Sequence, residues 1–145
     1  MENKLGRQKS PTSLHQLMFV LQQMSNELLL SETGVGLSSA LIMSTLSRSV
    51  PSTQRAVASK LRQTEANVSR QLHVMKRQGL VSIKQNRNDR RQREVLLTDK
   101  GASHYKKAAN LLDKQQKEIL RLVEAAEAKV FGQTIDNLLK SLQLN

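Results

Sequence analysis

Apolar residues recur at helical spacing along most of the chain. From Ser13 to about residue 32 they recur every three or four positions, and Ser13 can cap this helix. A second short helix is expected from Ser38 to Ser47, followed by Pro51, because proline disfavours helical backbone at the preceding residue. Two amphipathic stretches near the end predict helices from Thr98 to about Ala126 and from Val130 to Leu144.

Two short helices in the middle of the chain form a helix-turn-helix pattern. Thr53 can cap the first, and Thr64 can cap the second, which is expected from Glu65 to Gln78 and ends at Gly79. The second helix has one apolar face, expected in the core and made of Val68, Leu72 and Met75. Its opposite face is polar and basic.

Two runs of alternating apolar residues follow directly and predict strands from Val81 to Gln85 and from Arg93 to Thr98. The tip between them holds three arginines and one aspartate. The expected fold class is therefore mainly α with a small β-hairpin wing. The helix-turn-helix with its hairpin, at about 38–98, is expected between amphipathic helices at about 13–32 and 99–145, in a single domain over 1–145.

The positive charge is concentrated in this middle segment. The chain has 23 Lys and Arg against 12 Asp and Glu, a net charge of +11. Between Arg55 and Arg93 there are 11 basic residues and only two acidic ones, Glu65 and Asp89, which gives this basic window +9 and the rest of the chain +2. So uneven a distribution predicts a polyanionic partner.

Several function classes are disfavoured. The chain has no cysteine, hence no disulfide framework and no thiolate metal site. His15 and His104 have no companion ligand at metal-binding spacing, so no metal and no cofactor is expected. Neither a nucleophile with a base nor a glycine-rich phosphate loop is present, so an enzyme is not expected. The longest N-terminal apolar run is too short for a signal or transmembrane segment, which predicts a cytoplasmic protein without a membrane partner.

The fifty residues from Ser52 to Gly101 resemble the winged helix-turn-helix of the multiple antibiotic resistance regulator (MarR) family. The resemblance is carried, in order, by Ala58 and Leu61, Val68-Ser69-Arg70 and Leu72, Gly79-Leu80-Val81, Asp89-Arg90-Arg91, and Leu97-Thr98-Asp99-Lys100-Gly101. It differs in lacking a glycine in the turn at Arg62-Gln63. The resemblance implies a homodimer that binds a pseudo-palindromic operator in double-stranded DNA and regulates transcription, with repression favoured over activation.

The expected DNA contacts fall into three groups. A helix over Glu65–Gln78, ~21 Å long, fits the major groove. Its DNA-facing residues are expected to be Ala66, Asn67, Ser69, Arg70, His73 and Arg77. Arg70 is the candidate guanine reader, and a phosphate contact is its alternative. The wing residues expected at the minor groove are Arg87, Asp89, Arg90 and Arg91, with the Asp89 carboxylate bound to the Arg91 guanidinium. Phosphate contacts are expected from Arg55, Lys60 and Lys76.

The amphipathic helices at both ends need a surface to cover their apolar faces, and a two-fold dimer supplies one. A small-molecule effector, if one exists, is expected between these helices and the DNA-binding unit, near Phe19, Met43 and Tyr105. An anionic effector would suit so basic a chain, and control by protein abundance alone is the alternative. The rival function is a basic RNA-binding or nucleoprotein module without operator specificity. The basic window holds no Phe, Tyr or Trp to stack on bases, which favours duplex DNA.

Overall fold

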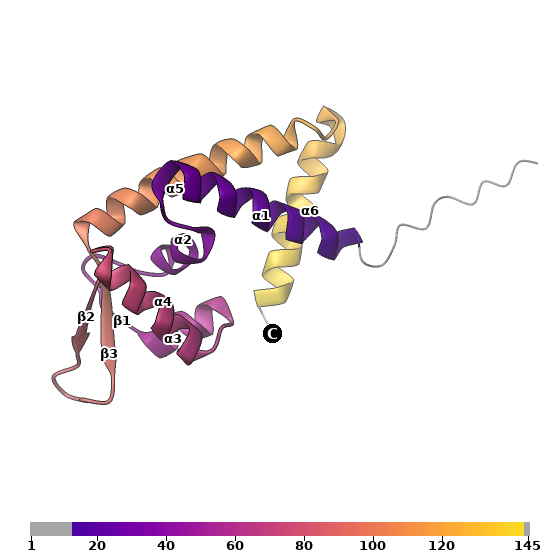
Figure 1. Ribbon diagram of the computed structural model, residues 1–145. Helices are drawn as coiled ribbons and strands as arrows, with labels where there is room; N and C mark the ends of the chain where they lie inside the picture. Colours follow the sequence, from indigo (N-terminus) through magenta and orange to yellow (C-terminus); the bar gives the residue numbers. More distant parts are fainter. Residues whose placement is uncertain (1–12, 144–145) are drawn as a thin grey trace, which may run out of the picture. The chain divides into compact units, whose positions relative to one another are not determined.

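The structure is a computed structural model that describes residues 13–143, so Leu144, the last residue of the predicted final helix, lies outside the described part. Within that range the chain is mostly helical with a small antiparallel sheet, which confirms the predicted fold class (Figure 1). In chain order the elements are α1 (Ser13–Thr33), α2 (Leu37–Ser44), β1 (Ser52–Thr53), α3 (Gln54–Leu61), α4 (Glu65–Arg77), β2 (Val81–Gln85), β3 (Arg93–Leu97), α5 (Asp99–Leu120) and α6 (Ala125–Gln143).

The chain divides into two compact units, one up to Ala109 and one from Asn110 onward. The core of the first unit is built by α1 to α4, the sheet and the turn after α4. Its fully buried large side chains are Leu29, Ile42, Met43, Val57, Val68, Leu72, Met75, Leu80 and Val95. Among them are Val68, Leu72 and Met75, the three residues predicted on the inner face of α4. No helix within residues 13–143 is long and apolar enough to cross a membrane.

The helix-turn-helix forms as the caps predict. The Thr53 hydroxyl accepts a hydrogen bond from the Ala56 N–H at 3.1 Å, and the Thr64 hydroxyl accepts one from the Asn67 N–H at 3.2 Å. In the turn between α3 and α4, Arg62 adopts left-handed backbone with φ 51° and ψ 42°. Arg62 thus takes, with a side chain, a conformation that glycine adopts without strain.

The sheet has three strands in the order β1-β3-β2, all antiparallel. The predicted hairpin of β2 and β3 is present, with Ile83 opposite Val95 and Val81 opposite Leu97. The sequence did not predict β1, where Ser52 pairs with Val95. A two-residue strand is too short to show the alternation by which strands are recognised.

Several helix boundaries differ from the prediction. The second helix ends at Ser44 rather than Ser47, and Thr98 precedes α5 as its cap, accepting a hydrogen bond from the Gly101 N–H at 3.0 Å. The long helix ends at Leu120 rather than near Ala126, and α6 begins at Ala125. The turn over residues 121–124, Arg-Leu-Val-Glu, contains neither Gly nor Pro, so the sequence carried no local signal for this break.

The start of α5 lies directly against the turn that follows α4. A Cβ placed on Gly101 would lie 2.0 Å from the Leu80 carbonyl oxygen, so only glycine fits there. The same carbonyl accepts hydrogen bonds from the Thr98 N–H at 3.1 Å and the Thr98 hydroxyl at 3.0 Å. Gly79, at φ 75°, provides the left-handed residue that ends α4 as predicted. These contacts fix α4 and the base of the wing to α5.

Candidate nucleic-acid interface

The outer face of α4 is polar, basic and open to solvent. Of the residues predicted on it, four are exposed: Ala66, Arg70, His73 and Arg77. The two predicted flanking residues, Asn67 and Ser69, are half-buried. The structure adds Val74, which is 43% exposed and lies one turn after Arg70 on the same face. The sequence offered a signal for it, since Val74 does not fit the spacing of the buried residues.

The wing tip is organised by the side chain of Asn86. Its carbonyl oxygen accepts hydrogen bonds from the Asn88 N–H at 2.7 Å and the Asp89 N–H at 3.1 Å. The Gln92 N–H donates to the Asp89 carbonyl at 3.0 Å, which closes a four-residue turn, and the Asn86 N–H donates to the Gln92 carbonyl at 2.9 Å. The tip is therefore a folded loop and not an extended segment.

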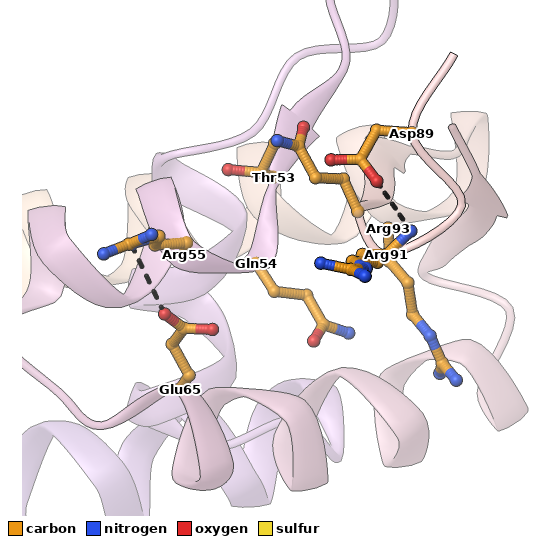
Figure 2. A pocket seen from close by; sticks show the side chains of 8 residues that line it. Thr53, Gln54, Arg55, Glu65, Asp89, Arg91 and Arg93 are labelled. Carbon is orange, nitrogen blue, oxygen red and sulfur yellow. Dashed lines mark hydrogen bonds and ion pairs between the residues drawn. The ribbon is translucent and has the colours of Figure 1, made fainter. Parts of the chain in front are cut away.

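Asp89 stabilises this loop in a different way from the one expected. Its carboxylate accepts a hydrogen bond from the Arg91 backbone N–H at 3.0 Å, drawn in Figure 2 as the dashed line that starts at Asp89. Within residues 13–143, no ion pair joins Asp89 to the Arg91 guanidinium. The expectation assumed extended backbone, in which residues two apart point the same way. The turn at Asp89–Gln92 removes that alternation.

The arginines of the tip are left with their charge uncompensated. Arg87, Arg90 and Arg91 are all exposed, and none of them belongs to an ion pair in the described part of the chain. The nearby carboxylate of Glu94 instead accepts a hydrogen bond from the Asn86 side-chain amide at 2.7 Å. The tip thus presents three guanidinium groups on a hydrogen-bonded loop.

A polar hollow of about 370 Å³, here called the α3–wing hollow, separates the wing from the start of α3. It is lined by Thr53, Gln54, Arg55, Glu65, Asp89, Arg91, Gln92 and Arg93. In Figure 2, Arg55 and Glu65 lie on one side and Asp89 and Arg91 on the other. The Arg55 Nε lies 3.6 Å from a Glu65 carboxylate oxygen, and both side chains remain largely exposed. The buried Nε2 of Gln54 has no hydrogen-bond partner among the described residues.

A second basic hollow, here called the α4–wing hollow, has about 320 Å³ and lies between α4 and the hairpin. It is lined by His73, Lys76, Ile83, Lys84, Gln85 and Arg93. Arg93 borders both hollows, so it lies between the α4 side of the wing and the α3 side. No sequence pattern assigned a site role to Gln54, Lys84 or Arg93. These three residues line the hollows because β2 pairs with β3 and because β1 joins the sheet.

The remaining predicted site residues are more dispersed. Lys60 is exposed on the last turn of α3 and lines neither hollow. Of the residues expected around an effector, Phe19 is 61% exposed and Met43 only 1% exposed, while Tyr105 is half-buried. Within residues 13–143, no group of three metal-ligating side chains comes together.

Comparison with known proteins identifies the winged-helix unit. Residues 33–92 match the sequence model of the MarR family, and this range spans α2 to the wing tip. The winged-helix unit of this chain is therefore similar in sequence to the MarR family. A search of curated protein sequences found no significant match.

Solved structures of MarR-family proteins share the fold over most of the chain. A crystal structure of MarR has a TM-score of 0.82 at 15% identity, over 92% of this chain and 99% of that one. The Staphylococcus aureus MepR–DNA complex has a TM-score of 0.74 at 18% identity, over 89% and 94%. Streptococcus pneumoniae FabT in complex with DNA has a TM-score of 0.73 at 18% identity, over 90% and 92%. The similarity therefore extends beyond the winged helix to the flanking helices.

Proposed function

We propose that this protein is a sequence-specific double-stranded DNA-binding transcriptional regulator that acts as a homodimer, with repression favoured over activation. The observation that carries the proposal is the exposed basic face of α4 beside a folded wing tip whose three arginines have no ionic partner among the described residues. Two MarR-family proteins of the same fold, MepR and FabT, have been crystallised with DNA.

The recognition helix in this proposal is α4. Its 13 residues span about 20 Å, a length that the major groove accommodates. Arg70 reads guanine, because a guanidinium can donate two hydrogen bonds to O6 and N7. The other residues facing the groove are Ala66, Asn67, Ser69, His73 and Arg77, and Val74 adds an apolar side chain suited to a thymine methyl group.

The wing and the basic hollows bind the backbone. Arg87, Arg90 and Arg91 enter the adjacent minor groove, where narrow A·T-rich sequence concentrates negative potential, and Asp89 holds the loop that carries them. Phosphates are bound by Arg55, Lys60 and Lys76. The structure leads us to add two donors, Gln54 and Arg93, because both border the α3–wing hollow. The unpartnered Nε2 of Gln54 is buried, so it would reach a phosphate oxygen only after its side chain turned toward the hollow.

Dimerisation is supported by exposed apolar side chains on two helices, each considered by itself. In α1 only Leu29 is buried, and seven large apolar residues are at least 43% exposed: Leu14, Leu17, Met18, Phe19, Val20, Met24 and Leu30. In α6 the exposed residues Phe131, Ile135, Leu138, Leu139 and Leu142 follow helical spacing. Monomeric proteins rarely expose such continuous apolar surface, and a second copy of the chain would cover it.

An effector that releases DNA is a further part of the proposal. It would bind near Phe19 and Tyr105, and Met43 would contribute only if the core opened, because its side chain is buried. A screen of anionic and neutral ligands for compounds that lower operator affinity tests this point. A screen in which no compound changes affinity favours control by protein abundance.

Salt-dependent competition binding tests the function. With about 6 to 10 phosphates neutralised, log K against log salt should have a slope of about −5 to −9, and duplex DNA should compete better than structured RNA. Arg70→Ala should weaken operator binding by about 5- to 150-fold, whereas the charge-matched control Arg121→Ala, outside the basic window, should change it little. Preference for RNA, or a flat salt dependence, would contradict the proposal.

A further inference from the structure

A chain of side-chain hydrogen bonds runs along the flank of the recognition helix. The Ser38 hydroxyl of α2 donates to the Gln71 carbonyl oxygen of α4. The Gln71 amide nitrogen donates to the Gln63 carbonyl oxygen at 3.0 Å, and the Asn67 amide nitrogen donates to the same oxygen at 2.9 Å. Gln63, Asn67 and Gln71 are spaced four residues apart, so they lie along one stripe of the helix and the turn before it.

The hydrogen bonds show how each amide is turned in this structure. A side-chain amide accepts through its oxygen and donates through its nitrogen. Because Ser38 donates to the Gln71 oxygen, the Gln71 nitrogen is directed to Gln63, whose oxygen then receives two donors. The nitrogen of Asn67 is held toward Gln63. In the part of the chain that the structure describes, the Asn67 carbonyl oxygen accepts no hydrogen bond.

We infer that Gln63 is a positioning residue that turns the Asn67 amide so that its carbonyl oxygen faces the DNA. The inference rests on the proposed function and assigns Asn67 a specificity. A carbonyl oxygen accepts from the exocyclic amino group of adenine or cytosine in the major groove, whereas guanine O6 and thymine O4 are themselves acceptors. Asn67 therefore selects an amino-bearing base at one position of each half-site. Its place in the first turn of α4 suits a contact with base edges.

An unheld asparagine would select much less. Its amide could turn over and donate its nitrogen to a keto oxygen instead, so it would accept either kind of base. In this chain, turning over the Asn67 amide alone loses the hydrogen bond to Gln63 and sets two oxygens against each other. The reverse arrangement is satisfied only when all three amides turn over together and the Ser38 hydroxyl becomes an acceptor. Loss of one such hydrogen bond corresponds to about a 2- to 13-fold change in an equilibrium, and we expect a preference of that size.

The test uses a selected operator duplex in which single adenines are replaced by purine, which lacks only the amino group, and single cytosines by 2-pyrimidinone. At one position per half-site, the parent should bind the replaced duplex about 2- to 13-fold more weakly than the unmodified duplex. Asn67→Ala should bind the two duplexes equally well at that position. Gln63→Ala should reduce this loss to below about 2-fold. Gln63→Glu should retain it, because a carboxylate still accepts from both Asn67 and Gln71. The added negative charge of Gln63→Glu lowers affinity for all sequences alike, so it cancels in the ratio of affinities for the unmodified and the replaced duplex.

A second readout needs no DNA. In the free protein, the NMR signals of the Asn67 side-chain amide protons should show slowed exchange in the parent and in Gln63→Glu, and ordinary exchange in Gln63→Ala. Sequence-specific binding with an unchanged adenine-to-purine ratio in Gln63→Ala would overturn the inference and leave the proposed function standing. A protein that selects no duplex sequence would overturn the proposed function, and the base-reading role of Asn67 with it.

Discussion

Asp89 lies among three arginines on a surface proposed to face DNA, so its removal sets two effects of opposite sign against each other. Its carboxylate accepts the Arg91 N–H at 3.0 Å and thereby holds the loop that presents the arginines. Losing one such hydrogen bond costs ~0.5 to 1.5 kcal/mol, or about a 2- to 13-fold loss of affinity if the loop must be ordered on binding. Losing the negative charge at roughly 8 Å from a phosphate in water gains ~0.5 kcal/mol, about 2-fold, and less at physiological salt.

Two substitutions separate these effects. Asp89→Asn removes the charge but keeps an oxygen that can accept the Arg91 N–H, so it should bind the operator up to about 2-fold more tightly than the parent. Asp89→Ala removes both, and should bind about 2- to 13-fold more weakly than Asp89→Asn, which places its affinity between about that of the parent and about 13-fold below it. Fluorescence anisotropy at matched salt measures all three. Equal affinities of the two variants, at or above the affinity of the parent, would refute a role for this hydrogen bond. Equal affinities that both fall below that of the parent would show that the negative charge itself holds an arginine in the complex.

Three further sets of substitutions test the packing and the assembly. Gly101→Ala should lower the free energy of unfolding by about 2 kcal/mol or more, because its Cβ would meet the Leu80 backbone. Gly132→Ala, with open space around it in a helix, should raise the free energy of unfolding by up to ~1 kcal/mol. Urea denaturation measures both variants, and similar values for the two would contradict the close approach at Gly101. Arg62→Gly should be about 1 kcal/mol more stable than Arg62→Ala, because only glycine relieves the left-handed backbone, and equal stabilities would remove the argument from strain. In sedimentation velocity, Leu138→Glu should shift the protein to monomers or aggregates while Gln133→Glu stays dimeric, and a stable Leu138→Glu dimer would exclude this face of α6 from the interface.

The repeating patterns of the sequence predicted most of the winged-helix unit. The caps at Thr53 and Thr64, the left-handed Gly79 and the buried face of α4 each depend on residues close together in the chain, and each is confirmed. Strand β1 was missed because its two residues are defined by pairing with β3, more than 40 positions away. The break after Leu120 was missed because the residues there are ordinary helix formers.

In the candidate interface, too, features that depend on residues close together in the chain were predicted, and features that depend on distant contacts were not. Exposure of Arg70, His73 and Arg77 follows from helical periodicity alone, and the structure agrees. The contact between Asp89 and the Arg91 N–H depends on the turn in the wing tip, whose backbone the extended interpretation did not anticipate. The contributions of Gln54 and Arg93 to the α3–wing hollow depend on how separate elements meet. The spacing of Gln63, Asn67 and Gln71 was a visible signal, although the sequence did not show which amide accepts and which donates.

The most direct test of the central claim is selection of bound duplexes from a random DNA pool by the full-length protein, followed by sequencing of the enriched pool. A homodimer that inserts α4 into successive major grooves predicts a two-fold symmetric motif with half-site centres about one helical turn, ~34 Å, apart. The motif should have A·T-rich flanks where the wings enter the minor groove. An enriched pool without a shared motif, or a single motif without two-fold symmetry, would contradict the account.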